Sequence, residues 1–232
     1  MRRVLVTRPE PGASATAQRL VEKGYVPIVL PLTEIVPLAP GALPASIDAV
    51  VATSANAFRH MPDGFLEKLG GIPLYVVGAR TAEAARREVA HVAPNARALA
   101  AMLAGELGEA AHVLHLTGRV RRPDLKSILE GLGHRVTEIE LYDARALHFS
   151  ASEIGTKLGS EPFWAALVYS QRGGEILGEI AAKVPAIFAS TMFVCISTDA
   201  GYGLQAIGAR VALADAPDET GLLARLDELA GG

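Results

Sequence analysis

The sequence predicts an α/β protein made of two similar five-stranded parallel-sheet domains, one inserted into the other. Short apolar runs alternate with helical segments along the chain, which is typical of parallel sheets covered by helices. The 232 residues are half hydrophobic and one-fifth charged, enough to bury two cores. The third observation is a match in spacing between two sets of five expected strands.

The chain opens with a strand–helix–strand unit. Residues 3–7 form a buried-type strand, and Ser14 is expected to cap a helix that runs to Val21. Gly24 is expected to end this helix before a second strand over 25–30. A proline-rich passage over 31–44 follows and predicts a linker.

A second series of strands follows the linker. They are expected over 48–53, 73–77, 91–93, 112–116 and 134–147, with helices between them, one from about Pro123 to Gly131. The stretch 134–147 is longer than one sheet needs, so we expect it to return from the inserted domain to the first. Tyr142 lies within it.

Three further strands, over 164–169, 192–196 and 209–213, complete the first set, and the two sets then align. Thr7 and Thr117 each end a strand before a loop with Arg and Pro. Gly24 and Gly133 follow them at nearly equal spacing. The remaining equivalences are Ser54 with Ser170, Gly78 with Ser197, and Val92 with Val211. Duplication explains these spacings, and accidental similarity between α/β segments is the alternative.

The predicted boundaries follow from this alignment. One domain comprises 1–36 and 148–232, and the inserted domain comprises 41–140. Residues 37–40 and 141–147 are the expected connectors.

Composition argues against several classes of protein. A net charge of −3 and the lack of a Lys/Arg run argue against nucleic-acid binding. The apolar run 4–6 stops at Thr7, too early for an export signal, and no segment suits a membrane span. Cys195 is expected to be a small core residue, and a cytoplasmic location is the default.

Ligands of open parallel sheets bind beyond the carboxyl ends of the strands. Here those ends are rich in hydroxyls, glycine and arginine and precede helix N-termini, which favours a polyanionic ligand held between the domains. For any one serine, an ordinary helix cap is the stronger interpretation. The predicted rim residues are Thr7, Arg8, Ser54, Asn56, Gly78, Thr81, Thr117, Gly118, Arg119, Ser170, Gln171, Arg172 and Ser197.

Metal ligands and nucleotide motifs are not evident. His112 and His115 are expected on opposite faces of a strand, so no metal pair is predicted. Glu138 and Glu140 are expected on one strand face with Tyr142, and a solvated face accounts for the two carboxylates. The Tyr142 phenol stays protonated at neutral pH, so it is either a proton donor or an interdomain packing residue.

Several segments, in their order along the chain, resemble the uroporphyrinogen-III synthase family. They are 4–9 (VLVTRP), 53–57 (TSANA), 76–82 (VVGARTA), 117–119 (TGR) and the strand ending in Leu141-Tyr142. The resemblance implies two flavodoxin-like domains joined by a two-stranded connector, with the active site in the cleft between them. No metal or organic cofactor is implied.

The implied reaction closes linear hydroxymethylbilane to uroporphyrinogen III, with inversion of ring D and loss of water. The family's connector tyrosine, thought to assist loss of the terminal hydroxyl, corresponds to Tyr142. Its cleft-facing hydroxyl and glycine positions correspond to Ser54, Thr81, Gly118 and Ser170.

One region departs from the family pattern, and some matters stay open. Where a Gly-x-x-Thr-Ala turn is common, this chain has Ser197-Thr-Asp199, which places a carboxylate near an expected anion. The alternative function is a non-enzymatic two-domain binding protein for an anionic metabolite. A monomer is expected, and transient contact with hydroxymethylbilane synthase, which would hand over the unstable bilane, is left open.

Overall fold

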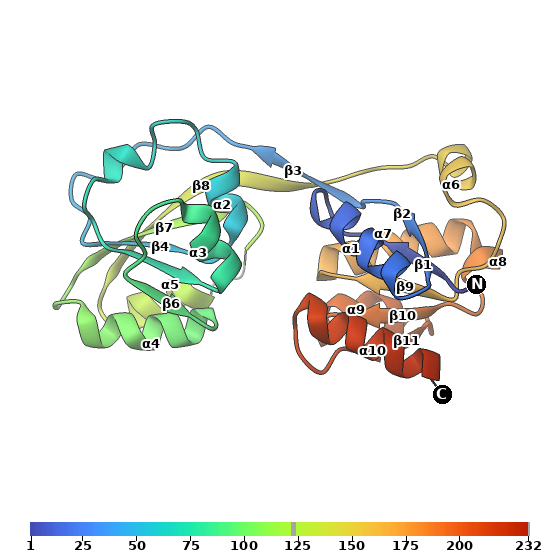
Figure 1. The fold of residues 1–232 in the computed structure, drawn as a ribbon. Helices are drawn as coiled ribbons and strands as arrows, with labels where there is room; N and C mark the ends of the chain where they lie inside the picture. Colours follow the sequence, from blue (N-terminus) through green and yellow to red (C-terminus); the bar gives the residue numbers. More distant parts are fainter. Residues whose placement is uncertain (122–123, 232) are drawn as a thin grey trace. The chain divides into compact units, whose positions relative to one another are not determined.

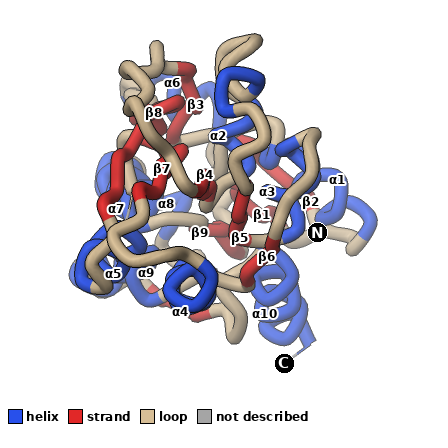
Figure 2. Tube along the Cα trace, turned by 90° about the vertical axis from the view of Figure 1, so that its left-hand side faces the viewer, coloured by secondary structure: helices blue, strands red, loops and turns tan. Residues whose placement is uncertain are grey.

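The computed structural model describes residues 1–121 and 124–231 (Figure 1). The chain forms two compact units, Met1–Glu34 with Arg145–Gly232, and Ile35–Ala144, called unit 1 and unit 2 here. Figure 2 shows the helices in blue and the strands in red.

Unit 1 is built on a parallel sheet with the order β11-β10-β9-β1-β2, five strands within the described residues. Its strands are β1 (Arg3–Val6), β2 (Val26–Val29), β9 (Ala165–Val168), β10 (Met192–Cys195) and β11 (Arg210–Leu213). Its helices are α1 (Gly12–Glu22), α6 (Ala151–Leu158), α7 (Gln171–Lys183), α8 (Pro185–Phe188), α9 (Thr198–Ala206) and α10 (Glu219–Gly231).

Unit 2 is built on a sheet with the order β3-β8-β7-β4-β5-β6. Its strands are β3 (Thr33–Pro37), β4 (Ala49–Ala52), β5 (Leu74–Val77), β6 (His91–Ala93), β7 (His112–Gly118) and β8 (Arg135–Ala146). Its helices are α2 (Ala55–Arg59), the 3₁₀ turn η1 (Glu67–Leu69), α3 (Ala79–Ala85), α4 (Ala96–Glu106) and α5 (Asp124–Gly131). The predicted helix start at Pro123 lies outside the described residues.

Five strands of each sheet lie in the same order, which confirms the predicted correspondence. Thr7 follows β1 and Thr117 lies in β7, and pairing these strands aligns β2-β1-β9-β10-β11 with β8-β7-β4-β5-β6 position by position. Gly24 and Gly133 both take positive φ, at 82° and 87°, as expected for residues that end a helix. Two copies of one α/β plan account for this agreement better than accident does.

Each sheet is covered by helices on both faces. In unit 1, α1 and α10 supply the buried apolar side chains of one face, and α6, α7 and α9 those of the other. In unit 2, α4 and α5 cover one face, and α2, η1 and α3 cover the other. Cys195 is fully buried in the unit 1 core, as predicted, and burial raises the pKa of its thiol to about 12.

The proline-rich passage contains a strand that the sequence did not predict. Leu38 N–H donates to the Leu141 carbonyl and Leu147 N–H donates to the Leu32 carbonyl, both at 2.9 Å, so β3 runs antiparallel to β8. Pairing with β8 satisfies the backbone of β3 despite the surrounding prolines. The expected two-stranded connector is therefore formed by β3 and β8, and unit 2 gains a sixth strand.

One predicted helix start, at Ser14, differs from the structure. Helix α1 begins at Gly12, and Ser14 lies inside it, because the Glu10 carboxylate accepts from both Ser14 N–H (3.0 Å) and Ser14 Oγ (2.8 Å). Helix α3 begins at Ala79 and ends before Arg86, whose φ of 51° is left-handed. In the part of the chain that the structure describes, no helix is long and apolar enough to cross a membrane.

Candidate active site

Tyr142 lies where the pairing of β8 with β7 changes register. Thr117 is opposite Glu140, whereas Gly118 is opposite Tyr142, so Leu141 is an extra residue in β8 at this point. Tyr142 packs against the same core cluster as Leu141. The prediction that Tyr142 shares a strand face with the two glutamates before it is therefore wrong, because the extra residue reverses the alternation of side chains.

Gly118 provides the surface on which the Tyr142 ring lies. A Cβ atom on Gly118 would lie 2.6 Å from Cε2 and Cζ of Tyr142, so any other residue here must displace the ring. The His60 ring lies on another side, with 6.3 Å between ring centroids. Burial raises the pKa of the Tyr142 phenol, while a side-chain hydrogen bond with Ser54 acts to lower it. Tyr142 is thus a half-buried, protonated phenol at neutral pH.

A cavity of about 480 Å³ lies beside Tyr142 in unit 2. Most of the residues that line it lie at or just after the carboxyl ends of β4 to β7, as expected for an open parallel sheet. They are Thr53, Val77, Pro94, Asn95, Ala96, Arg97, His115, Thr117, Val120, Arg121, Asp124, Leu125, Ile128 and Tyr142. The size is that of sites for small organic ligands.

Helix α4 begins at the wall of this cavity. Asn95 caps the helix, and its Oδ1 accepts from Ala98 N–H at 2.9 Å. Arg97 follows in the first turn and is exposed. Among the described residues, Arg97 has no ion pair or hydrogen-bond partner, so its charge is available to a ligand. Asp124, at the start of α5, adds a negative charge to the same lining.

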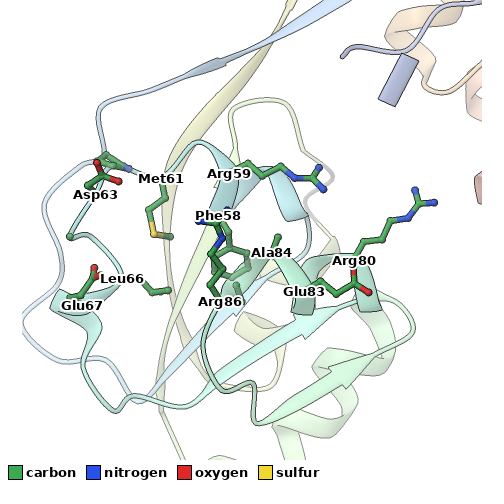
Figure 3. A pocket seen from close by; sticks show the side chains of 13 residues that line it. Phe58, Arg59, Met61, Asp63, Leu66, Glu67, Arg80, Glu83, Ala84 and Arg86 are labelled. Atoms are coloured by element: carbon green, nitrogen blue, oxygen red, sulfur yellow. The ribbon is translucent and has the colours of Figure 1, made fainter. Parts of the chain in front are cut away.

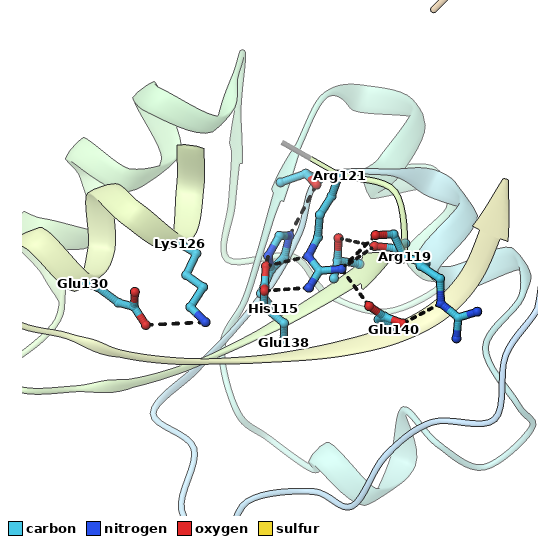
Figure 4. A network of polar contacts seen from close by, with 10 residues as sticks. His115, Arg119, Arg121, Lys126, Glu130, Glu138 and Glu140 are labelled. Carbon is cyan, nitrogen blue, oxygen red and sulfur yellow. Dashed lines mark hydrogen bonds and ion pairs between the residues drawn. The ribbon is translucent and has the colours of Figure 1, made fainter. Parts of the chain in front are cut away.

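A chain of polar contacts joins His115 to the turn after β7 (Figure 4). His115 is 2% exposed, and its Nδ1 lies 3.3 Å from Glu138 Oε1 while Nε2 lies 3.4 Å from Thr53 Oγ1. Arg121 donates to both oxygens of Glu138, from Nε at 2.9 Å and from Nη2 at 2.8 Å. The hydrogen bond from His115, together with Arg121, lowers the pKa of Glu138 to about 2.

The chain of contacts continues through the second glutamate. Arg121 Nη1 donates to Glu140 Oε1 at 2.9 Å, and Arg119 Nε donates to Glu140 Oε2 at 3.0 Å. Arg119 Nη1 also lies 3.6 Å from Asp143 Oδ2. The interpretation of the two glutamates as a solvated face is wrong for Glu138, which is only 12% exposed, and holds for Glu140, which is 34% exposed, although arginines bind both carboxylates.

The predicted rim residues of unit 2 fall into two groups. Ser54, Thr117 and Gly118 lie around Tyr142 or line the cavity beside it. Asn56, Gly78, Thr81 and Arg119 are outside the cavity lining. Ser54 Oγ caps α2 by accepting from Asn56 N–H at 3.3 Å. Gly78 precedes α3 with a φ of 81°, Thr81 is buried, and Arg119 is ion-paired.

The predicted rim residues of unit 1 serve mainly its own structure. Thr7 is buried and donates to the Leu167 carbonyl at 2.6 Å. Ser170 Oγ caps α7 and Ser197 Oγ caps α9, accepting from backbone N–H groups at 3.1 and 3.4 Å. Gln171 Nε2 donates to Glu175 at 3.1 Å. Arg172, which also has polar contacts, follows in the first turn of α7.

Arg8 is bound to a buried carboxylate of α10. Its Nη1 lies 3.2 Å from Glu219 Oε1, and its guanidinium lies 4.7 Å from the centre of the Tyr169 ring. Arg19 Nη1 lies 2.6 Å from Glu219 Oε2, and Thr16 donates to the same carboxylate. Burial acts to raise the pKa of Glu219, but Thr16, Arg8 and Arg19 hold it below its ordinary value. Arg8 therefore ties α10 to the β1–α1 loop.

The departure at Ser197-Thr-Asp199 forms the start of α9. Asp199 lies in the first turn of this helix and is exposed, where a carboxylate is favourable next to free N–H groups. It also has polar contacts of its own. The carboxylate is thus compatible with a helix start, and Ser197 acts as the cap.

A second hollow of about 570 Å³ lies between α2, α3 and the loop that holds η1 (Figure 3). In Figure 3, Met61 and Leu66 face Phe58, whereas Arg59 and Arg80 extend away from the pocket. The hollow is larger than the cavity beside Tyr142, but its lining includes none of the predicted site residues. We therefore assign the candidate site to the cavity beside Tyr142.

The two strand histidines do not form a metal site. His112 Nε2 lies 2.7 Å from Thr137 Oγ1, while His115 contacts Glu138, the next residue of β8. Consecutive strand residues point to opposite faces, so the two histidines do as well, as predicted. Within the described residues, no group of three or more His, Cys, Asp and Glu could hold a metal ion.

Sequence reasoning missed three site residues. His115 was considered only as half of a metal pair, and its place under Thr53 depends on strand register. Arg121 gave no signal because its partners lie on another strand. Arg97 follows Asn95, a good helix cap, and that cap was the one signal that could have placed a helix start and its arginine at the rim.

Comparisons with known proteins agree on one family. The family model described as "Uroporphyrinogen-III synthase HemD" matches residues 14–224. The uroporphyrinogen-III synthetase of Helicobacter pylori 26695 has a similar structure, with a TM-score of 0.70 and 19% identity over 99% of this chain and 100% of that one. A mutant uroporphyrinogen III synthase from the extremely thermophilic bacterium Thermus thermophilus gives 0.56 and 16%, over 100% and 98%. No curated protein sequence matches the chain.

Proposed function

Since the chain belongs to the uroporphyrinogen-III synthase family, we propose that it carries out the family reaction at the cavity beside Tyr142. The reaction closes linear hydroxymethylbilane to uroporphyrinogen III, with inversion of ring D and loss of one water. This is the chemistry of a cyclising lyase in tetrapyrrole biosynthesis. The substrate is a tetrapyrrole whose acetate and propionate groups make it a polyanion.

The observation that carries the proposal is the setting of Tyr142. Its phenol is half-buried, is kept protonated by burial, and lies on the wall of the cavity. We assign it the role of proton donor to the terminal hydroxyl of the bilane. The C–O bond breaks, the pyrrole supplies the electron pair, and the hydroxyl leaves as water with the phenol proton. Ring closure releases one proton, which restores the phenol.

The cavity suits a pyrrole ring with its carboxylate side chains. Val77, Leu125 and Ile128 give it an apolar wall, while Arg97 offers a charge with no partner among the described residues. By contrast, Arg119 and Arg121 are neutralised by glutamates and contribute little net attraction for an anion. Holding the bilane curled is catalysis by positioning, and it needs few reactive side chains.

The proposal includes where the protein acts, its oligomeric state and a candidate partner enzyme. We place the activity in the cytoplasm, with the protein acting as a monomer. Hydroxymethylbilane closes by itself to the type I isomer, so a transient contact with hydroxymethylbilane synthase would favour capture of the bilane before that happens. Mixing the two proteins and measuring the type I fraction as their ratio changes tests this contact.

The direct test is incubation of the purified protein with freshly generated hydroxymethylbilane. After oxidation of the products to porphyrins, chromatography separates the type I and type III isomers. We expect type III to dominate and its share to rise with protein concentration. Type I alone, at every protein concentration, would contradict the proposal and would favour a non-enzymatic protein that only binds the bilane.

A further inference from the structure

We infer that Arg121 is a positioning residue for Tyr142, acting through the turn that follows β7. The inference rests on the proposed function, because it gives Arg121 a purpose only if the Tyr142 phenol acts on the substrate. Arg121 lines the cavity beside Tyr142, but its Nε, Nη1 and Nη2 donors are already bound by carboxylates and carbonyls of the protein.

Arg121 is bound on the side of β8 by two carboxylates. Nε and Nη2 hold Glu138 through two parallel bonds of 2.9 and 2.8 Å, and Nη1 reaches Glu140 at 2.9 Å. Two-point arginine–carboxylate pairs of this kind fix orientation as well as distance. The carboxylate of this pair is mostly covered, with 12% of the Glu138 side chain exposed, while 27% of the Arg121 side chain is exposed. The guanidinium therefore has one well-defined place on β8.

The same guanidinium holds the backbone of the turn. Arg121 Nη1 lies 3.1 Å from the Gly118 carbonyl and 3.0 Å from the Arg119 carbonyl. Arg119 N–H donates in turn to the Tyr142 carbonyl at 2.9 Å, and Arg119 Nε binds Glu140. The side chains of Arg119 and Arg121 and the backbone N–H of Arg119 thus all bind the turn to β8 (Figure 4).

This attachment matters because Tyr142 has almost no clearance over the turn. The Tyr142 ring lies against Gly118 so closely that a Cβ there would be 2.6 Å from two ring atoms. The register shift between β7 and β8 falls at the same point, so ladder pairing alone does not fix the position of the turn. Arg121 spans this irregular step and sets where Gly118, and hence the phenol, stands.

Gly118, at the start of the turn, is buried. Glu138, which binds Arg121, is also in contact with the buried His115 of β7, so Arg121 connects the turn to side chains inside the sheet. Substitution of Arg121 would leave Glu138 and His115 in place, but the turn could then shift slightly relative to the Tyr142 ring. Misplacement of a catalytic group on the ångström scale lowers turnover without weakening substrate binding. A purely structural role would instead lower stability and leave the kinetics of the folded fraction unchanged.

The test is a double-mutant cycle between Arg121 and Tyr142. Arg121→Met should lower kcat on the order of tenfold and leave KM within about twofold. In the Tyr142→Phe background the same change should cost less than about twofold, because the phenol it positions is already gone. Arg121→Lys keeps a charge beside Glu138 but cannot hold both carbonyls, so it should give the same result if Arg121→Met does not fold.

Lys126→Met is the matched control. Lys126 is a cation on α5 of the same unit, paired with Glu130 at 3.7 Å, and it lies apart from Arg119 and Arg121 (Figure 4). Its kinetics should match the unmodified protein. An equal loss from the Arg121 changes with and without the phenol, or unchanged kcat in Arg121→Lys, would overturn the inference. Unchanged kcat in Tyr142→Phe alone would instead overturn the proposed role of Tyr142.

Discussion

Tyr142 shows how one side chain obtains its character from three neighbours. Gly118 has no side chain, and this leaves room for the Tyr142 ring. His60 lies beside the ring, and Ser54 forms a hydrogen bond with the Tyr142 hydroxyl. Burial raises the phenol pKa, so the group is a proton donor across the ordinary pH range. The sequence placed Tyr142 at the site but could not show that Gly118 and Ser54 make the setting.

Arg97 is the residue whose charge we expect to act on the substrate carboxylates. Arg97→Gln should raise KM roughly two- to fivefold and leave kcat nearly unchanged, because an exposed charge pair contributes modestly to binding. Steady-state kinetics at low salt would measure this, and the effect should shrink as ionic strength rises.

Asp124→Asn gives the opposite charge change in the same cavity. It removes a negative charge from the lining and should lower KM, whereas Arg97→Gln should raise it. A KM that does not respond to either substitution would show that the carboxylates bind elsewhere.

At the scale of elements, β7 and β8 are joined by a charge network that runs from the buried His115 through the largely covered Glu138 to the exposed Arg119. Glu138 has a pKa of about 2, held down by the hydrogen bond from His115 and by Arg121. A carboxyl group with a depressed pKa adds stability that is present above its unfolded value near 4.5 and is lost as pH falls towards 2. The shift corresponds to about 3 kcal/mol.

Glu138→Gln should therefore change the acid response of stability. At neutral pH we expect the variant to unfold more easily than the parent protein, and the gap in unfolding free energy should close between pH 4.5 and 2. Urea denaturation across a pH series measures the gap, and Glu219 contributes equally to both proteins. A gap that stays constant through this range would contradict the assigned role of Glu138.

The elements that sequence patterns locate well are those with regular periodicity. The apolar runs placed β4, β5 and β10 within a residue or two. Strand β3 was missed because prolines concealed a segment whose partner, β8, lies far away in the sequence. The register shift opposite Gly118 was also invisible, because pairing between strands leaves no local signal. That one-residue shift separated Tyr142 from the face of Glu140.

At the scale of the whole molecule, duplication explains the fold, and the sites differ between copies. Five strands of each sheet lie in the same order. In unit 1 the buried Glu219 on α10 binds Arg8, whereas in unit 2 the partly exposed Glu138 on β8 binds Arg121. Thr33 follows Gly24 by nine residues (33 − 24), as Tyr142 follows Gly133 (142 − 133), so the two positions correspond. Thr33 starts β3 and is buried. Of the two connector strands only β8 therefore carries a phenol at this position, a difference that the spacing of the two copies already predicts.

The central claim is that the Tyr142 phenol assists loss of the substrate hydroxyl, and the rate of Tyr142→Phe tests it most directly. Phenylalanine keeps the ring against Gly118, so the fold and KM should be retained. General acid catalysis is worth about a hundredfold or more, so single-turnover formation of uroporphyrinogen III should slow by at least that order. A Tyr142→Phe protein that forms the type III isomer at the parent rate would contradict the account.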